Sequence, residues 1–323
     1  MKQRSLGRTG LQISELVFGG GFVGGILLHA SDQIRRDAIQ LAIRSGINWI
    51  DTAASYGNGQ SEEVVGWLLS ELPHQNRPQV STKFSVDPKE GDYTGQIRRS
   101  LEQSLRRLKM TSVPLVQLHN KLGSGDGQLP LDEVTKSDGV LDALDKIRAE
   151  GLTDFIGFTA LGDANACRAV VESGRVDTAQ VYYNLINPSA GFDIKGRWHS
   201  DDYTGLLKSC QLFNVGVLGI RVYAAGILAS RVQHGREIPV TQNSDYDNEL
   251  KRADMLRELL GEMDGSDAQK ALRFVLDQDA IDGAVLGLAD LSHLQEAIQA
   301  TKMDPLPNSV TVALKDLWRR DYR

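Results

Sequence analysis

Short apolar segments alternate with amphipathic segments along most of the chain. The short segments are rich in β-branched residues, which is typical of buried strands. Eight strands are expected, at residues 16–18, 48–50, 79–82, 115–118, 155–158, 179–182, 215–222 and 283–286. Between them, apolar residues recur at the spacing of one helix face, as at Ile97, Leu101, Leu105 and Leu108 or at Leu291, Leu294 and Ile298.

Residues that favour helix ends flank several of the amphipathic segments. The predicted starts are Ser31 or Asp32 and the segment 61–63, and the predicted ends are Gly46, Gly151 and Gly174. Before the first strand we expect a β-hairpin, in which residues 4–7 turn at Thr9 and Gly10 into residues 11–14.

Eight alternations of strand and helix are what a closed parallel barrel needs, whereas a doubly wound sheet usually has fewer strands. The length of 323 residues allows two ordinary domains or one barrel, and no linker, repeat or low-complexity segment divides the chain. We therefore predict an α/β fold, a (β/α)8 barrel forming a single domain over residues 1–323. Long connections at 120–138, 184–202 and 223–248 leave the carboxyl ends of strands, where barrels build active sites, although surface decoration is the alternative.

The composition narrows the class of protein. A formal charge of -6, with 41% apolar and 6% aromatic residues, indicates a globular protein without a basic surface for nucleic acid or anionic membranes. The apolar window at 16–28 is too short to span a bilayer, and no apolar run follows the charged N-terminus as in a signal peptide. Cys167 and Cys210 fall in predicted helices and are expected to be buried hydrophobes rather than a disulfide, which favours a reducing, cytoplasmic location.

The glycine-rich segment at 19–24 fits the G-x-G-x-x-G pattern of dinucleotide-binding Rossmann folds. In that motif the helix begins within the glycines, so that its N-terminus meets the pyrophosphate. Here residues 25–29 intervene before the predicted cap at Ser31. We interpret the segment as a flexible loop over the mouth of a barrel.

Four polar residues follow neighbouring strands. Asp51 and Tyr56 come after the second predicted strand, Lys83 after the third and His119 after the fourth. Each alone is unremarkable, since strand-end lysines are usually solvated and single histidines are usually satisfied in the core. Because the carboxyl ends of barrel strands converge, we expect the four to form one proton-donating group.

Their chemistry is complementary. A lysine ammonium stabilises a neighbouring phenolate, an aspartate keeps the lysine charged, and a histidine can donate a hydrogen bond to a carbonyl oxygen. No serine or cysteine nucleophile stands beside a base, and the other histidines do not have metal-ligand spacing, so neither hydrolysis nor a metal site is indicated. A tyrosine acid suits protonation of an alkoxide formed by hydride addition, and the hydride would come from a cofactor.

These segments together resemble the aldo-keto reductases: 51–57 with Ser61 and Glu62, then 81–83, 117–120, 156–159 and 180–184. The order and spacing match over nearly the whole chain. The resemblance implies a (β/α)8 barrel that binds NADP(H) or NAD(H) in extended form. It also implies that Tyr56 is the general acid in carbonyl reduction and the general base in alcohol oxidation, in a catalytic tetrad of Asp51, Tyr56, Lys83 and His119.

The same resemblance implies further site residues. Those expected at the cofactor are Gly20, Gly21, Asp51, Thr159, Gln180, Ile220, Gly226, Leu228, Gly287, His293 and Glu296. Those expected at the substrate are Phe22, Tyr56, His119 and Trp198. Thr159 and Gln180 correspond to residues that hold the nicotinamide carboxamide, and the segment 226–228 to the loop over the pyrophosphate.

The sequence departs from the family pattern around the cofactor. Ala160 replaces an asparagine that contacts the carboxamide, and Ile220 replaces an aromatic residue that stacks on the nicotinamide, unless Tyr223 takes that place. Gly287 and His293 stand where NADPH-preferring members have a lysine and an arginine for the 2′-phosphate. The sequence therefore predicts a weakened preference for NADP(H) and use of NAD(H).

Arg221 or Arg231 remains as an alternative source of charge for the 2′-phosphate. The leading hypothesis is an oxidoreductase that interconverts aldehydes, ketones or sugars with alcohols or lactones, from the branch that includes galactose, fucose and threo-aldose dehydrogenases. The alternative is a dinucleotide-binding regulatory protein with little turnover, as among the potassium-channel β-subunit relatives. The sequence leaves open the substrate, the preferred direction and the oligomeric state.

Overall fold

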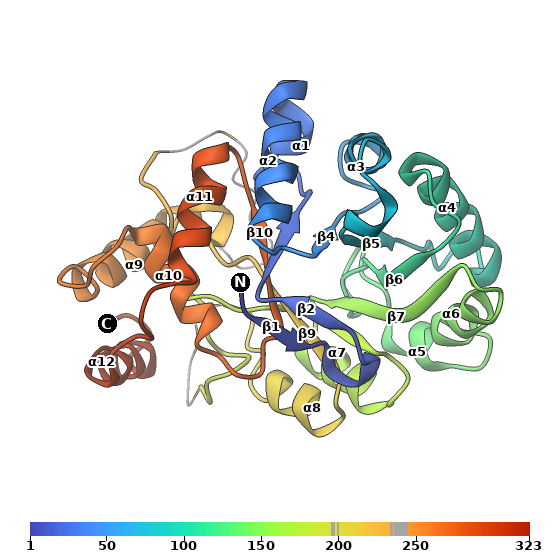
Figure 1. Cartoon of the computed structure of the whole chain (residues 1–323). Helices are drawn as coiled ribbons and strands as arrows, with labels where there is room; N and C mark the ends of the chain where they lie inside the picture. Colours follow the sequence, from blue (N-terminus) through green and yellow to red (C-terminus); the bar gives the residue numbers. More distant parts are fainter. Residues whose placement is uncertain (195–197, 199, 233–234, 236–244) are drawn as a thin grey trace.

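All eight predicted strands are present, and they close into a parallel barrel (Figure 1). The computed structural model describes residues 1–194, 198, 200–232, 235 and 245–323. Each strand pairs with its sequence neighbour, and the last strand pairs with the first. The strands are β3 (Leu16–Gly19), β4 (Trp49–Asp51), β5 (Gln79–Phe84), β6 (Val113–Leu118), β7 (Thr153–Ala160), β8 (Thr178–Tyr182), β9 (Gly216–Ile220) and β10 (Gly283–Gly287). The predicted (β/α)8 fold is confirmed.

The predicted hairpin plugs the amino end of the barrel. Its strands β1 (Gln3–Ser5) and β2 (Gln12–Ser14) pair antiparallel around a short 3-10 turn. Gly7 in this turn has a φ of +47°, and a Cβ there would lie 2.2 Å from the backbone nitrogen of Gly216, at the start of β9. The close approach lets hairpin residues join the apolar layer inside the barrel, which consists of Leu6, Ile13, Val17, Trp49, Leu115 and Leu218.

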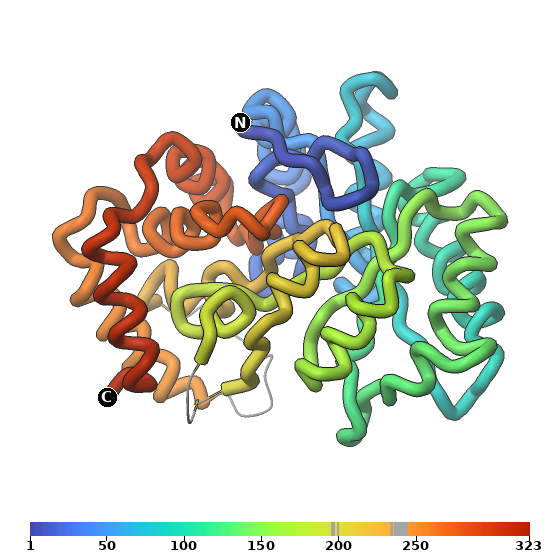
Figure 2. The backbone as a smooth tube through the Cα atoms, turned by 90° about the horizontal axis from the view of Figure 1, so that it is seen from below, coloured from blue at the N-terminus to red at the C-terminus, as the bar shows by residue number. Residues whose placement is uncertain are grey.

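Helices surround the barrel, and their apolar faces pack on the outer faces of the strands to form the main core. They are α1 (Ile26–His29), α2 (Asp32–Arg44), α3 (Gln60–Ser70), α4 (Tyr93–Leu108), α5 (Leu131–Thr135), α6 (Val140–Ala149), α7 (Ala164–Glu172), α8 (Leu206–Leu212), α9 (Tyr246–Leu259), α10 (Asp267–Leu276), α11 (Leu291–Ala300) and α12 (Asn308–Arg319). The C-terminal α12 packs beside α9, on the side of the molecule away from α4 and α6 (Figure 1 and Figure 2).

Most of the predicted helix ends are confirmed. The Ser31 side chain accepts a hydrogen bond from the Ile34 amide and caps α2. The predicted cap at Ser61 is wrong, because α3 begins at Gln60 with Gly59, at a φ of +91°, in the N-cap position. Ser61 is used elsewhere: its hydroxyl donates to the carbonyl of Gly20 at 3.0 Å.

The loop segments carry additional structure. The one-turn helix α1 directly follows the glycine-rich segment, and the connection at 120–138 contains α5. The connections at 184–202 and 223–248 lie partly outside the described residues. In the described part, the last connection holds a short 3-10 turn (Ala224–Gly226), and α9 and α10 both follow before β10.

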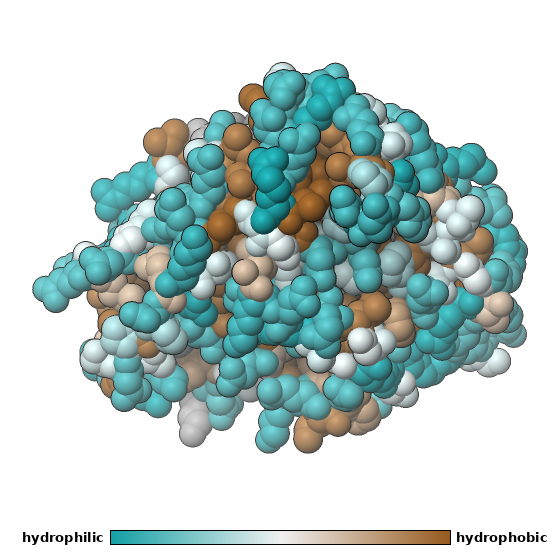
Figure 3. Space-filling model, viewed as in Figure 1, coloured by the Kyte–Doolittle hydropathy of each residue, from teal (hydrophilic) through white to brown (hydrophobic). Residues whose placement is uncertain are grey.

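Hydrophilic residues cover most of the face shown in Figure 3, with small hydrophobic areas between them. Within the described part of the chain, no helix is both long enough and apolar enough to cross a membrane.

Candidate active site

Three of the four predicted catalytic residues lie at the carboxyl ends of adjacent strands. Asp51 is the last residue of β4, Lys83 is the second-last residue of β5, and His119 directly follows β6. Tyr56 is in the turn that leaves β4, and this turn is closed by a hydrogen bond from the Tyr56 amide to the carbonyl of Ala53. The barrel therefore brings the four residues together, as the sequence predicts.

Lys83 is the centre of the group. Its side chain is buried, and Nζ lies 2.5 Å from Oδ2 of Asp51, 2.9 Å from the carbonyl of Thr52 and 3.2 Å from Oη of Tyr56. Burial acts to lower the pKa of Lys83, but the charges and hydrogen bonds of Asp51 and Tyr56 outweigh it and raise the pKa above its ordinary value. Lys83 is therefore an ammonium group at neutral pH.

Tyr56 is half-buried between two of its partners. Lys83 Nζ lies 4.7 Å from the centre of the phenol ring, and the His119 ring meets it edge-on with centres 5.7 Å apart. Gly21 lies against the same ring, since a Cβ there would be 3.7 Å from it. The phenol is thus held on one side by a cation and on another by an imidazole.

His119 is electrically neutral in this setting. Burial, and after it the positive charge of Lys83, lower the pKa of His119 to about 3. Its Nδ1 lies 3.4 Å from the hydroxyl of Ser55, and its backbone amide donates to the carbonyl of Phe84. A neutral imidazole beside the phenol can donate one hydrogen bond to a substrate oxygen.

A buried ion pair behind the site fixes the start of α3, the helix that follows the Tyr56 turn. Glu62 is fully buried and accepts a hydrogen bond from the Thr82 hydroxyl, next to Lys83. Arg107 of α4 donates to the other oxygen of Glu62 at 2.7 Å. The contact ties α3 and α4 to β5 and so holds the Tyr56 turn relative to Lys83.

The predicted carboxamide residues lie on the same rim. Thr159 and Gln180 are neighbours across β7 and β8, and both are buried. Thr159 Oγ1 is buried with no hydrogen-bond partner in the described part of the chain, so a bound polar group has an atom to engage. Gln180 Nε2 donates to Oδ1 of Asp51 at 2.7 Å, which leaves its carbonyl oxygen to accept from a carboxamide.

Next to them, Gly20 donates from its backbone amide to the carbonyl of Asp51 at 2.8 Å. Ile220 ends β9, and Gly226 and Leu228 lie in the following turn. Together with Gly21, these residues line the rim from β3 around to β9. The spread suits an extended dinucleotide better than a compact ligand.

The remaining predicted cofactor residues belong to β10 and α11. Gly287 ends β10, next to Gly19 of β3, and is exposed. His293 accepts a hydrogen bond at Nδ1 from the Ala289 amide at 3.4 Å. Glu296 accepts a hydrogen bond from the Ser266 hydroxyl and so also joins α11 to the segment before α10.

The two predicted aromatic substrate residues differ in position. Phe22, in the loop after β3, is 41% exposed and meets the ring of His29 edge-on. Trp198 is half-buried, and its ring packs against Tyr322 near the C-terminus, with centres 6.2 Å apart. Phe22 therefore offers an open aromatic face, whereas Trp198 is tied to the C-terminal segment.

Two residues that contact Asp51 were not predicted. Ser81 donates to Oδ1 of Asp51 at 2.8 Å, and Gln117 donates to the same oxygen at 3.2 Å. They lie two positions before Lys83 and His119 on β5 and β6, so they share the inward face of the strand. That period of two was the signal that could have identified them.

Other chemistry has less support in the structure. No group of three or more His, Cys, Asp or Glu residues that could hold a metal is found among the described residues. Cys167 and Cys210 are buried and free, which confirms that they do not form a disulfide. Burial raises the pKa of both thiols, that of Cys210 to about 12, so neither is a nucleophile at neutral pH.

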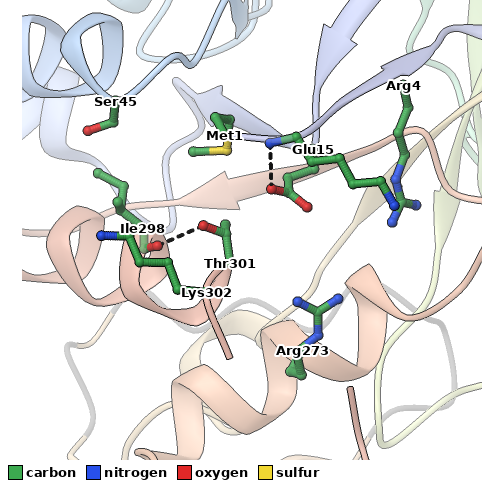
Figure 4. Close-up of a pocket in the computed structure, with 9 residues that line it drawn as sticks. Met1, Arg4, Glu15, Ser45, Arg273, Ile298, Thr301 and Lys302 are labelled. Atoms are coloured by element: carbon green, nitrogen blue, oxygen red, sulfur yellow. Dashed lines mark hydrogen bonds between the residues drawn. The ribbon is translucent and has the colours of Figure 1, made fainter. Parts of the chain in front are cut away.

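A pocket of about 480 Å³ lies at the opposite, amino-terminal end of the barrel (Figure 4). Its two arginines already have partners: Arg4 donates to the carbonyls of Leu276 and Gln278 at 2.6 and 3.3 Å, and Arg273 pairs with Asp277 at 2.8 Å. Contacts of this kind stabilise the amino face of a barrel. The pocket is lined by Met1, Lys2, Arg4, Glu15, Ser45, Arg273, Ile298, Thr301 and Lys302.

Known proteins match this chain over most of its length. The family model described as the Aldo/keto reductase family matches residues 15–319. L-galactose dehydrogenase from Arabidopsis thaliana is 27% identical over 311 residues, which covers 94% of this chain and 89% of the relative.

Two solved structures share the fold. An aldo-keto reductase from Bacillus halodurans, in its holo form, superposes with a TM-score of 0.75 at 22% identity, covering 98% of this chain and 96% of its own. An aldo/keto reductase from Klebsiella pneumoniae, in complex with NADP and acetate, superposes with a TM-score of 0.69 at 23% identity, covering 99% of this chain and 96% of its own.

Proposed function

Because this chain belongs to the aldo/keto reductase family, we propose that it is a nicotinamide-dinucleotide-dependent oxidoreductase that interconverts aldehydes, ketones or sugars with alcohols or lactones. The observation that carries this proposal is the position of Lys83 Nζ, 2.5 Å from Asp51 and 3.2 Å from the Tyr56 hydroxyl. A phenol beside a buried ammonium is a group that can give up and regain a proton. Carbonyl reduction requires such a group, because the carbonyl oxygen takes up a proton while the carbonyl carbon takes up a hydride.

In the reductive direction, Tyr56 Oη donates its proton to the carbonyl oxygen of the substrate. The hydride for the carbonyl carbon would come from a bound reduced dinucleotide. The phenolate left behind is stabilised by the Lys83 ammonium, which Asp51 keeps charged, and it regains a proton from solvent. His119, neutral at the pH of the reaction, donates a hydrogen bond to the same oxygen and orients the carbonyl.

In the oxidative direction the Tyr56 phenolate accepts the proton of the substrate hydroxyl, and a bound oxidised dinucleotide would accept the hydride from the carbon. Oxidation of the hydroxyl on the ring carbon of a cyclic sugar then gives a lactone. The likeness to L-galactose dehydrogenase supports aldoses as the first substrates to test. Phe22 offers one open aromatic wall for the substrate.

Thr159 and Gln180 would hold the carboxamide of the dinucleotide, and Gly226 and Leu228 the pyrophosphate. The NADP bound by the Klebsiella pneumoniae relative supports a dinucleotide cofactor. At the segment expected to meet the adenosine end, residues 283–300 include no lysine or arginine, and the acids Asp290 and Glu296 lie on it. We therefore propose that NAD(H) is used in preference to NADP(H).

The substitution Tyr56→Phe tests the proposed function. Loss of the proton donor is expected to lower kcat at least about 100-fold, with cofactor affinity little changed. The measurements are consumption of NADH and NADPH with a panel of aldehydes and aldoses, in both directions, and cofactor binding by fluorescence titration. Tyr93→Phe is a matched control, since Tyr93 is a buried tyrosine whose hydroxyl donates to Glu133 on α5, away from the four residues.

Unchanged turnover in Tyr56→Phe would show that Tyr56 is not the proton donor of the reaction. If the wild-type protein binds the cofactor tightly and yet turns over no member of the panel, the function is regulatory binding rather than catalysis.

A further inference from the structure

The two oxygens of the Asp51 carboxylate have different partners. Oδ2 receives the Lys83 ammonium, whereas Oδ1 accepts three hydrogen bonds from neutral side chains. These come from Gln180, Ser81 and Gln117 at 2.7, 2.8 and 3.2 Å. All five side chains are buried inside the barrel, and the three neutral donors come from three different strands, β8, β5 and β6.

The direction of these hydrogen bonds follows from the surroundings. The Ser81 hydroxyl oxygen accepts from the indole Nε1 of Trp49 at 3.0 Å, so its own hydrogen is free to donate to Asp51. The side-chain amide nitrogen of Gln117 donates to Asp51. The side-chain oxygen of Gln117, Oε1, is buried and has no hydrogen-bond partner among the described residues. Ser81, Gln117 and Gln180 therefore donate to one oxygen of Asp51, and Trp49 orients the Ser81 hydroxyl for this contact.

A carboxylate buried in a barrel stays ionised only if it is paired and hydrogen-bonded. With Oδ1 held by three donors, Asp51 has one orientation, and in that orientation Oδ2 faces Lys83. If donors are lost, the carboxylate can take up a proton or rotate away. Burial is the largest single influence on the pKa of Lys83 and acts downwards, so a weakened counterion favours the neutral amine. A neutral amine no longer stabilises the phenolate of Tyr56.

We propose that Ser81, Gln117 and Gln180 are positioning residues for the reaction, which hold Asp51 ionised and directed at Lys83 and thereby set the pH at which Tyr56 exchanges its proton. This inference rests on the proposed role of Tyr56 as acid and base. The three residues do not act on substrate themselves; they act through Asp51 and Lys83. Loss of a donor is expected to weaken the contact of Asp51 with Lys83, and with it the positive charge beside the Tyr56 hydroxyl.

Gln117 is the most informative of the three to change. Gln180 is also expected to contact the cofactor, and the Ser81 hydroxyl also accepts a hydrogen bond from Trp49. The side chain of Gln117 donates to Asp51. Gly157 on β7 makes room for it, because a Cβ there would lie 3.3 Å from Gln117 Cγ. Gln117→Leu therefore removes one donor to Asp51 while keeping a side chain of similar size.

The experiment measures the ionisation of Tyr56 without the cofactor. Phenolate absorbance is titrated with pH for each variant and for the same variant carrying Tyr56→Phe, and the difference isolates Tyr56. Gln117→Leu and Ser81→Ala are each expected to raise the midpoint by about one pH unit, a tenfold change in the ionisation equilibrium. The rising limb of kcat against pH in the oxidative direction should move by the same amount, and Ser81→Thr, which keeps the hydroxyl, should restore the midpoint.

Thr178→Val is the matched control. Thr178 lies two positions before Gln180 on the inward face of β8, is buried, and has no hydrogen-bond partner for its hydroxyl among the described residues. It should leave the midpoint unchanged. If Gln117→Leu does not fold, Ser81→Ala gives the same measurement alone.

The proposal is overturned if the donor variants lower kcat without moving the midpoint, which would make the donors purely structural. It is also overturned if Thr178→Val moves the midpoint as far. Failure of the proposed function is a separate result, since it would be seen as unchanged turnover in Tyr56→Phe whatever the phenolate titration shows.

Discussion

His119 shows how one side chain can be kept neutral in a site that contains a cation. The nearby Lys83 and the surrounding protein both oppose a second positive charge, and the pKa of His119 falls from 6.5 to about 3. The imidazole therefore does not titrate between pH 5 and 8. A pH dependence of activity in that range has to come from another group.

The low pKa of His119 has a consequence for stability. In the unfolded chain the imidazole takes up a proton as the pH falls through 6.5, whereas in the folded chain it does so only near 3. The unfolded state therefore binds more protons between these values, and the folded state loses stability as the pH falls. From pH 7 to pH 5 the loss from this group is at most about 2 kcal/mol.

This prediction is checked with His119→Asn, which cannot titrate. Urea denaturation at pH 7 and pH 5 should show a smaller fall in the free energy of unfolding for the variant than for the wild type, by up to about 2 kcal/mol. Other titrating groups are common to both proteins and cancel in the comparison. Equal falls would show that His119 protonates normally in the folded protein.

At the residue scale, the sequence was informative where chemistry and strand ends coincide. Lys83 and His119 could be grouped with Asp51 because each ends a strand of one barrel. Ser81 and Gln117 lie two positions before Lys83 and His119, which places them on the inward face, but this spacing alone does not say which group they contact. Only the distances inside the closed barrel show that both side chains reach the same oxygen of Asp51.

At the scale of elements, α11 is the segment that bears on cofactor choice. Asp290 caps its first turn by accepting from the Ser292 amide at 2.8 Å, which contributes to the lowered pKa of Asp290. Gly287 lies just before it, is exposed, and a Cβ there would be 3.5 Å from the nearest atom, the nitrogen of Gly24. A side chain at Gly287 is therefore tolerated.

We predict that the double substitution of Gly287→Lys and His293→Arg will increase affinity for NADPH. Two cations at this end of α11 can pair with a 2′-phosphate, and a gain of at least about tenfold in Kd is expected, with little change for NADH. Fluorescence titration of both cofactors against wild type and variant is the measurement. A wild-type preference for NADPH of a hundredfold or more would contradict the proposed use of NAD(H).

Element by element, periodicity predicted the eight strands and the principal helices because each has one apolar face on a common core. It missed α1, a single turn just after the glycine-rich segment, since four residues are too few to show a helical period. It also misplaced the start of α3. The Ser61 hydroxyl donates to the Gly20 carbonyl instead of capping the helix. This tertiary contact cannot be predicted from a local capping pattern.

For the whole molecule, the contact between the C-terminal segment and the connection after β8 joins distant parts of the sequence. Trp318 donates from its indole nitrogen to the carbonyl of Leu185 at 3.0 Å. The Tyr322 hydroxyl lies 2.7 Å from that carbonyl and 2.9 Å from that of Ile186. Both rings are buried, so the C-terminal segment fixes the first residues of a loop that leaves the active-site rim.

Tyr322→Phe is expected to lower the free energy of unfolding by about 1–2 kcal/mol, because it removes a donor from buried carbonyls. Tyr183→Phe is a suitable control, since Tyr183 is also buried and its hydroxyl accepts a long hydrogen bond of 3.5 Å from Gln278. Denaturant unfolding of the two variants should show the larger loss for Tyr322→Phe. Equal losses would mean that the contact with the loop contributes nothing specific.

This closing contact could not have been predicted. The fold class followed from counting alternations, but Trp318 and Tyr322 meet Leu185 more than 130 positions earlier in the sequence. Contacts of this kind depend on where the completed barrel places its loops. The periodicity of apolar residues in the sequence does not predict them.

The pairing of β10 with β3 has a consequence for how the chain is made. Translation begins at the amino end, so β3 emerges early from the ribosome, while β10 at residues 283–287 emerges only after most of the chain. Until then the nascent sheet has an unpaired strand at each edge, which is the kind of surface that joins to other chains. The barrel of this protein can therefore close only after β10 has been synthesised.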